Sequence, residues 1–298
     1  MTGKRRITLA RLPGQRRLEG RGCPKKTSRS AILGRLVIIA LLLQPQFVLA
    51  ATCTSKAREN IVIALDVGHN ARRPGEQCQR FTTCPWGETS ARGVPEYDFN
   101  IKLAQRIKEE LVGAGFQSTS LIVTTEEGVR GLYQRANRAN SMNADLFFSI
   151  HHDGVRDEYL KHWLYEDEPQ FFFDEAKGFS LHVSPRYAES LSLARILADE
   201  LMGIGLRFTT LHEPSNPAGA RVPFLDSARG IYLRDKLAVL NNTEMPAVLL
   251  EAGLIVNRDE ELDLSTTAYQ GKIATAVAET VQKFCSGLPL QGNQRGAR

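Results

Sequence analysis

Three short apolar runs, each bounded by Gly, Asp, Pro or Asn and each followed by a polar side chain, constrain the fold of this chain most strongly. They cover residues 61–67, 146–150 and 247–250. Apolar runs of this length with turn-forming residues at their ends are typical of buried β-strands. The sequence therefore predicts a sheet whose strands end in side chains able to do chemistry.

Segments of helical period separate these runs. Apolar side chains recur on one face of residues 101–111, charged side chains take the opposite face, and Gly113 predicts the end of this helix. Residues 190–201 and 269–284 show the same period. Strands that alternate with helices predict an α/β fold. We expect a single-domain sandwich with a central, mostly parallel or mixed sheet flanked by helices.

Two stretches do not fit the alternation. Residues 154–188 mix acidic and aromatic side chains, and residues 207–230 are rich in Pro, Gly and Ser, so both are expected to be long loops or insertions. A chain of 298 residues with 42% hydrophobic composition is long enough for one full core. The expected organisation is a leader at 1–50, a short segment at 51–60, one main domain at 61–286 and a polar tail at 287–298.

The excess of basic residues belongs to the first part of the chain. The formal net charge is +5, but residues 1–50 hold eleven Lys or Arg and only one acidic residue, Glu19. The remainder has 27 basic and 32 acidic residues, a net charge of −5. Nucleic acid is therefore not expected as a partner.

Residues 1–50 have the parts of a secretory signal. Basic residues extend to Arg35, the apolar run 36–43 follows, and small residues suited to cleavage precede Ala51. An uncleaved membrane anchor is the alternative, but the apolar run is shorter than the roughly 20 residues of a membrane span. We expect a secreted, periplasmic protein that contacts a membrane only through an uncleaved leader.

Removal of the leader leaves four cysteines, an even number in a compartment that permits disulfides. Cys78 and Cys84 lie in one loop and are close enough in sequence to pair. That pairing would leave Cys53 and Cys285 to join the two ends of the domain. Three pairings are possible for four cysteines, and free thiols are the alternative.

The polar residues that follow the three apolar runs are His69, His151 and Glu251. Side chains at the carboxyl ends of neighbouring parallel strands meet in one crevice. Two histidines and a carboxylate around an open coordination position are typical of a catalytic zinc site. His152 is adjacent to His151, and on a strand the two point to opposite faces, so the alternation of faces leaves open which one joins His69.

Five segments resemble, in order, the motifs of the zinc N-acetylmuramoyl-L-alanine amidases of the third amidase family. The quoted segments are Asp66-Val67-Gly68-His69, Glu96-Tyr97-Asp98-Phe99-Asn100-Ile101, Arg135 with Ala139-Asn140, Ser149-Ile150-His151, and Met245-Pro246-Ala247-Val248-Leu249-Leu250-Glu251-Ala252-Gly253, with Asn257 and Glu260 or Glu261 following. The resemblance spans almost all of residues 60–285. Val67 replaces the Pro usual in the first motif, and Thr124-Thr125 stands where the family shows Thr-Arg.

The resemblance implies that His69, Glu96 and His151 bind Zn²⁺ and that Glu251 is the catalytic carboxylate. Without it, Glu251 would be placed on the metal and Glu96 would be only an acid that favours the start of a helix. The implied activity is hydrolysis of the amide bond between the lactyl group of N-acetylmuramic acid and L-alanine in peptidoglycan. Asp66 is expected either to orient a ligand histidine or to solvate the end of its strand.

Other interpretations stay open at this point. The same ligands would serve a zinc peptidase that cuts within the stem peptide, and a catalytically silent wall-binding protein is a further alternative. One acid of the segment 154–188 could occupy the metal until a protein activator withdraws it, although a solvated acidic loop explains the same residues. Trp163 and the run Phe171-Phe172-Phe173 could line a glycan groove or anchor this segment.

Overall fold

The structure is a computed structural model, and it describes residues 53–71, 84–126 and 128–287. The predicted leader at 1–50 and residues 288–298 of the predicted tail lie outside the described residues. The strands are β1 Ile63–Val67, β2 Thr119–Ile122, β3 Leu146–Asp153, β4 Lys161–Tyr165, β5 Glu168–Phe172, β6 Ser180–Val183, β7 Phe224–Asp226, β8 Ile231–Leu233 and β9 Ala247–Leu254. The helices are η1 Arg58–Asn60, α1 Glu96–Gly113, α2 Gly128–Ser141, η2 Asp157–Tyr159, α3 Ala188–Gly203, α4 Ala238–Asn241, α5 Glu260–Leu264 and α6 Thr267–Cys285.

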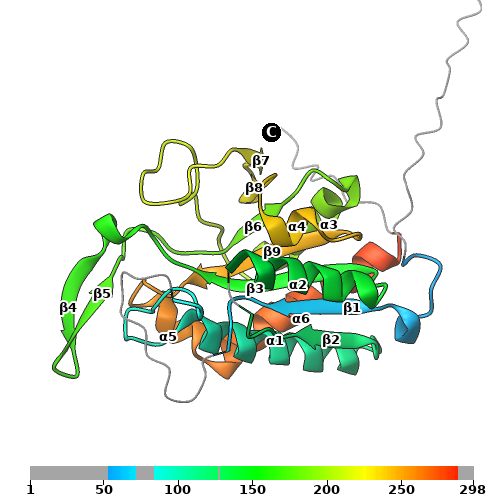
Figure 1. The fold of residues 1–298 in the computed structure, drawn as a ribbon, viewed down its shortest axis with the longest axis horizontal. Helices are drawn as coiled ribbons and strands as arrows, with labels where there is room; N and C mark the ends of the chain where they lie inside the picture. Colours follow the sequence, from blue (N-terminus) through cyan, green and yellow to red (C-terminus); the bar gives the residue numbers. More distant parts are fainter. Residues whose placement is uncertain (1–52, 72–83, 127, 288–298) are drawn as a thin grey trace, which may run out of the picture. The chain divides into compact units, whose positions relative to one another are not determined.

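Seven strands form a mixed sheet in the order β2-β1-β3-β9-β6-β8-β7. The four strands β2, β1, β3 and β9 are parallel, whereas β6 pairs with β9 in the antiparallel sense. The three apolar runs of the sequence became β1, β3 and β9, which are neighbours in the sheet. Figure 1 shows these strands crossing the middle of the domain with helices along them. The predicted α/β sandwich is confirmed.

Alternation along the strands divides the core into two layers. Ile63, Leu65 and Val67 of β1 pack with buried side chains of α1, α3 and α6. Ala64 points to the opposite face, where the core includes Phe147 and side chains of α2 and α4. Because successive side chains of a strand point to opposite faces, each buried strand needs helices on both sides.

Helix α1 starts and ends where the sequence predicts. Pro95 is its N-cap residue, with extended backbone, and acidic residues occupy the first turn, where they favour the helix dipole. Ala104, Ile107 and Leu111 of the predicted apolar face are buried. The helix ends at Gly113, and Gly115 takes a positive φ of 98°, a conformation that favours glycine.

Residues 154–188, expected to be a long loop or an insertion, contain regular strands. Strands β4 and β5 form an antiparallel hairpin that projects from one end of the sheet (Figure 1), and β6 is a member of the central sheet. These strands are short and carry polar side chains, so they lack the continuous apolar run on which the prediction depended. Residues 207–230 are mostly irregular, as expected, and contain only the strand β7 among their described elements.

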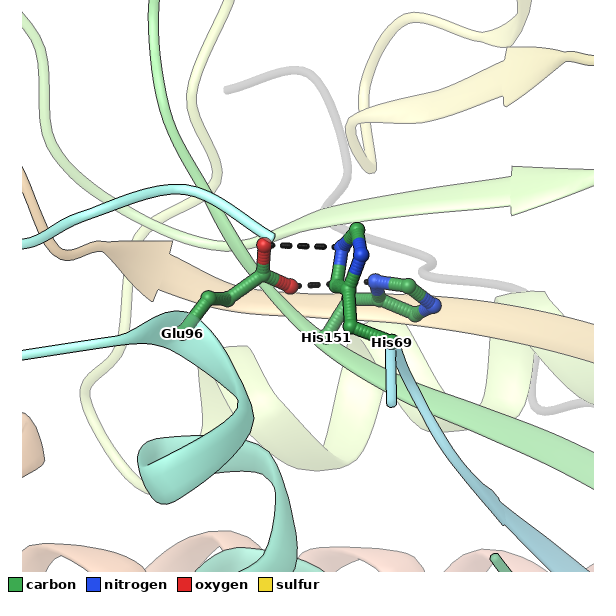
Figure 2. Close-up of side chains that lie close together, drawn as sticks. All are labelled: His69, Glu96 and His151. Carbon is green, nitrogen blue, oxygen red and sulfur yellow. Dashed lines mark hydrogen bonds and ion pairs between the residues drawn. The ribbon is translucent and has the colours of Figure 1, made fainter. Parts of the chain in front are cut away.

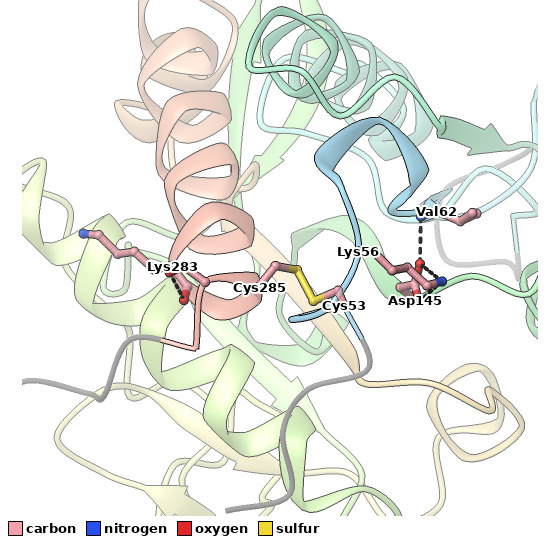
Figure 3. Close-up of a disulfide and its surroundings, with 7 residues drawn as sticks. Cys53, Lys56, Val62, Asp145, Lys283 and Cys285 are labelled. Carbon is pink, nitrogen blue, oxygen red and sulfur yellow. Dashed lines mark hydrogen bonds and ion pairs between the residues drawn. A yellow bond between two sulfur atoms is a disulfide. The ribbon is translucent and has the colours of Figure 1, made fainter.

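A disulfide joins the two ends of the described domain. Cys53 bonds Cys285 at the end of α6, which confirms that pairing (Figure 3). The same terminal segment is held by Lys56, whose Nζ donates to both oxygens of Asp145 at 2.6 and 2.8 Å. Cys84 is also disulfide-bonded. The predicted pairing of Cys84 with Cys78 lies outside the described residues.

Replacing Cys53 and Cys285 together by Ser will lower the free energy of unfolding by about 2–5 kcal/mol. The crosslink spans 232 residues, so its loss releases a large loop in the unfolded chain. Urea denaturation followed by circular dichroism measures the change. The exposed neighbour Ser55→Ala is the control and should leave the midpoint unchanged. An unaltered midpoint in the double variant would contradict a stabilising role for the bridge.

Candidate metal centre and active site

His69 lies two residues after the end of β1 at Val67. Its backbone has a positive φ of 62°, which is uncommon for a residue with a side chain. The preceding Gly68 packs against the ring of His151, and a Cβ at this position would lie 2.4 Å from Cε1 of that ring. Glycine is therefore required here because the two histidines approach each other across the backbone. Their ring centroids are 4.9 Å apart.

The structure decides between the two adjacent histidines of β3. His151 faces His69, and its backbone pairs with that of Glu251 on β9. His152 points to the other side, where its Nδ1 lies 2.7 Å from Oδ1 of Asn100 on α1. Burial lowers the pKa of His152 to about 3, so this imidazole is neutral. His152 is thus part of the packing beneath α1.

The first turn of α1 places the side chain of Glu96 beside the two histidines (Figure 2). Its Oε2 lies 2.9 Å from Nε2 of His69, and its Oε1 lies 3.0 Å from Nδ1 of His151. The carboxylate is 2% exposed and also accepts hydrogen bonds from the backbone N–H groups of Glu88 and His152. The search for polar residues at strand ends did not find Glu96, because Glu96 starts a helix. An acidic residue is common there because it interacts favourably with the helix dipole.

Electrostatics favour an ionised Glu96. Burial alone would raise its pKa, but the charges and hydrogen bonds of His69 and His151 hold the pKa of Glu96 well below its usual range. Burial likewise lowers the pKa of His69, yet Glu96 reverses this and the pKa is raised. The carboxylate therefore has the charge that a cation requires from its ligand.

The donor set fits a divalent transition metal. One ligand atom from each of His69, Glu96 and His151 can be chosen so that all lie within 4.8 Å of one another. Two imidazole nitrogens and one carboxylate oxygen are the ligands that zinc takes in catalytic sites with an open position. Among the described residues, His69, Glu96 and His151 thus form a group that could hold a metal ion, called here the metal-binding group.

Glu251 lies beside this group in the same cleft, which has a volume of about 760 Å³. Its inner oxygen, Oε2, is buried and has no hydrogen-bond partner among the described residues. Burial raises the pKa of Glu251 well above its usual range, and the negative charges of Asp153 and Glu96 raise it further. Glu96 and Glu251 thus differ: Glu96 is held ionised, and Glu251 takes up a proton readily.

A buried arginine fixes the end of β1. Nη1 of Arg135 on α2 donates to Oδ1 of Asp66 at 2.6 Å, and the guanidinium also donates to the carbonyl oxygens of Val67 and His69. Oδ2 of Asp66 accepts the hydroxyl of Ser149 at 2.7 Å. Asp66 therefore bonds no ligand histidine directly. It orients Arg135, and Arg135 holds the strained backbone that presents His69.

The loop that forms one wall of the cleft is held by a buried histidine that sequence reasoning did not single out. Nε2 of His212 lies 2.7 Å from Oδ2 of Asp153, and its Nδ1 accepts the backbone N–H of Ala220 at 3.1 Å. Both ring nitrogens are therefore occupied. His212 lies within an irregular stretch of the sequence, so no periodicity marks it.

The acidic side chains of residues 154–188 do not join the metal-binding group. Glu158, Asp174 and Glu175 form ion pairs with Arg156, Arg258 and Lys161. Of the acids in this segment, Asp157 lines the cleft. These contacts favour a solvated segment over one that occupies the metal site.

The aromatic residues of the hairpin anchor it. The indole N–H of Trp163 donates to the carbonyl of Ala91 at 2.9 Å, and its ring packs against the guanidinium groups of Arg92 and Arg258. Phe173 is buried in a small apolar cluster. The sequence left open whether these aromatic residues line a glycan groove or anchor the segment. The contacts of Trp163 and Phe173 favour an anchor.

Asn257, Glu260 and Glu261 brace the chain after β9 and lie outside the cleft lining. Glu260 accepts the backbone N–H groups of Gly178 and Leu254. Glu261 pairs with Arg92 at 2.7 Å. These residues connect the end of β9 to the segments that precede β6 and α1.

The family model described as N-acetylmuramoyl-L-alanine amidase matches residues 63–283. The endolysin of Bacillus phage SPP1 is 24% identical over 223 residues, which cover 75% of this chain and 65% of the endolysin. The N-acetylmuramoyl-L-alanine amidase Rv3717 of Mycobacterium tuberculosis is 25% identical over 263 residues, covering 83% of this chain and 94% of that protein. This chain thus spans about two thirds of the phage protein and nearly all of the mycobacterial one.

Two solved structures share the fold. The amidase Ami1 from Mycobacterium smegmatis superposes with a TM-score of 0.55 at 21% identity, covering 78% of this chain and 100% of that one. The amidase AmiC2 of Nostoc punctiforme gives a TM-score of 0.51 at 18% identity, covering 77% of this chain and 98% of that one. Similarity at these identities shows the architecture.

Glu96→Gln will weaken binding of a divalent cation by at least about 100-fold, because the change removes a charged ligand from a buried site. Competition with a chromophoric chelator measures the dissociation constant. Glu109→Gln, an exposed change on the same helix, is the matched control and should bind the cation like the parent protein. Equal affinity of Glu96→Gln and the parent would exclude Glu96 as a ligand.

Proposed function

The chain belongs to the N-acetylmuramoyl-L-alanine amidase family, and we propose that it uses a zinc ion to hydrolyse the amide bond between the lactyl group of N-acetylmuramic acid and L-alanine in peptidoglycan. In this proposal His69, Glu96 and His151 hold the ion and Glu251 is the catalytic carboxylate. The observation that carries it is the convergence of these three residues in one cleft beside Glu251, whose Oε2 is buried without a hydrogen-bond partner among the described residues.

A zinc ion bound by these residues would lower the pKa of a water molecule and polarise the scissile carbonyl. Glu96, ionised and held by two backbone N–H groups, supplies the negative charge of the ligand set. His69 is presented from a backbone that Arg135 holds in place. The protein thereby fixes the ligands before the ion binds, which reduces the cost of ordering them.

Glu251 acts as the general base and then as the general acid. It accepts a proton from the attacking water and gives it to the departing amine of L-alanine. A general base that must also act as an acid works best when its pKa lies near the working pH. Burial and the nearby charges of Asp153 and Glu96 raise the pKa of Glu251 in this direction.

We further propose that residues 1–50 act as a cleaved export signal and that the mature amidase domain, residues 61–286, works outside the cytoplasm in the periplasm. The arrangement of basic, apolar and small residues supports export. The bridge between Cys53 and Cys285 supports it independently, because disulfides persist mainly in oxidising compartments. No helix among the described residues is long and apolar enough to cross a membrane.

The test is the release of free stem peptide from purified peptidoglycan by the mature chain. Chelation of zinc should abolish release, and readdition of zinc should restore it. Glu251→Gln should lower the rate by about 100- to 10,000-fold, the usual contribution of a general acid or base. Glu244→Gln, an exposed change close before β9, is the matched control and should leave the rate unchanged.

Mass spectrometry of the products separates the alternatives. Peptides that begin with L-alanine, together with glycan strands that keep an intact lactyl group, support the amidase. Fragments cut within the stem peptide would instead establish a zinc peptidase. Binding of peptidoglycan without any release, by folded protein loaded with zinc, would establish a silent wall-binding protein.

A further inference from the structure

Two side-chain atoms stand out among the described residues because they are buried without a hydrogen-bond partner. They are Nδ1 of His182 and Oε2 of Glu251. Buried polar atoms are nearly always satisfied, and those that are not call for an explanation. Neither atom is explained by the contacts of the cleft described so far.

The two residues lie on the same face of the sheet. Strands β6 and β9 are antiparallel neighbours, with Ser180 opposite Glu251 and His182 opposite Leu249. Because alternate residues of a strand share a face, Ser180, His182 and Glu251 point to the same side. His182 and Glu251 are diagonal neighbours; such residues are typically about 7–8 Å apart, with their Cβ atoms somewhat closer, within reach of long side chains.

His182 is a fixed, neutral imidazole. It is 3% exposed, and burial lowers its pKa well below the usual value, with His212, Arg234 and His151 lowering it further. The ring stacks on Tyr232 at a centroid distance of 5.5 Å. Its Nε2 lies 3.0 Å from the hydroxyl oxygen of Ser180. When that hydroxyl donates to Nε2, the single proton of the neutral ring is on Nδ1, the atom without a partner.

We propose that His182 is a positioning residue for Glu251: its Nδ1–H donates, through one buried water, to the inner oxygen Oε2, while Ser180 fixes the tautomer. A water between the two atoms gives each a partner, as buried waters commonly do. The donor holds the carboxylate in one orientation and leaves Oε1 free for the attacking water. This inference rests on the proposed role of Glu251 as the general base.

The arrangement answers an electrostatic problem of the site. Glu251 must be ionised before it can accept a proton, yet its Oε2 is buried and has no hydrogen-bond partner among the described residues. A neutral donor at the inner oxygen stabilises the ionised form without adding a positive charge near the metal-binding group. His212 cannot supply this donor, because both of its ring nitrogens are occupied.

The test replaces His182 by Phe, which keeps a ring against Tyr232 and removes both nitrogens. With a small muramoyl-peptide substrate, kcat should fall about 10- to 100-fold, the value of a hydrogen bond to a charged group, while KM and zinc content stay unchanged. His182→Asn should recover part of the loss, because its amide nitrogen is as many bonds from Cβ as Nδ1. Ser180→Ala should lower kcat less than His182→Phe.

Two controls separate positioning from folding. Tyr232→Phe removes the hydroxyl that donates to the carbonyl of Thr209 in the same cluster, and it should lower the melting temperature without lowering kcat. In a Glu251→Gln background, His182→Phe should cause no further loss of the residual rate. An equal loss in both backgrounds, or His182→Phe that is folded and fully active, would overturn the inference.

The outcomes distinguish this inference from the proposed function. Full activity of Glu251→Gln would remove the general base and the role of His182 with it. An inactive Glu251→Gln together with an active His182→Phe would remove only the role of His182. A crystal structure of the parent protein that shows a water bonded to both Nδ1 of His182 and Oε2 of Glu251 would support the arrangement directly.

Discussion

The in-register parallel pairing of β1, β3 and β9 sets the positions of His69, His151 and Glu251 in the cleft. Val67 pairs with Ile150, and Ile150 pairs with Leu250, so the three strands reach the same level of the sheet. His151 and Glu251 follow as the next pair in register. A shift of one residue in either pairing would turn His151 or Glu251 to the opposite face. The apolar core on both faces of these strands prevents such a shift.

The site places two carboxylates close together and gives them opposite tendencies. Glu96 is surrounded by hydrogen-bond donors, two imidazoles and two backbone N–H groups, which stabilise its negative charge. Glu251 faces other negative charges, and its inner oxygen lacks a direct donor. One group suits a cation and the other suits a proton, and the difference comes from their neighbours because the side chains are chemically identical.

Rigid supports lie behind the site. Arg135 is bonded to Asp66 and to two backbone carbonyls, and this network holds His69 in an uncommon backbone conformation. Strain of this kind persists only when surrounding contacts fix it. On the other side of the sheet, His152 and Asn100 connect β3 to the first turns of α1, the helix that carries Glu96. The metal-binding group is therefore joined to both helical layers.

Apolar periodicity and strand-end chemistry are local properties, so they predicted the three buried strands, the helices α1, α3 and α6, and the histidines and glutamate at the strand ends. The resemblance to a family added Glu96, which no local pattern distinguishes from an ordinary acid at the start of a helix. The bond between Asp66 and Arg135, and the strand that residues 154–188 contribute to the central sheet, became known only from the tertiary structure. His182 and Glu251 are 69 positions apart in the sequence, and they are neighbours only because β6 lies next to β9 in the sheet. Contacts between distant segments follow from how the whole core packs, and a single sequence carries no local signal for them.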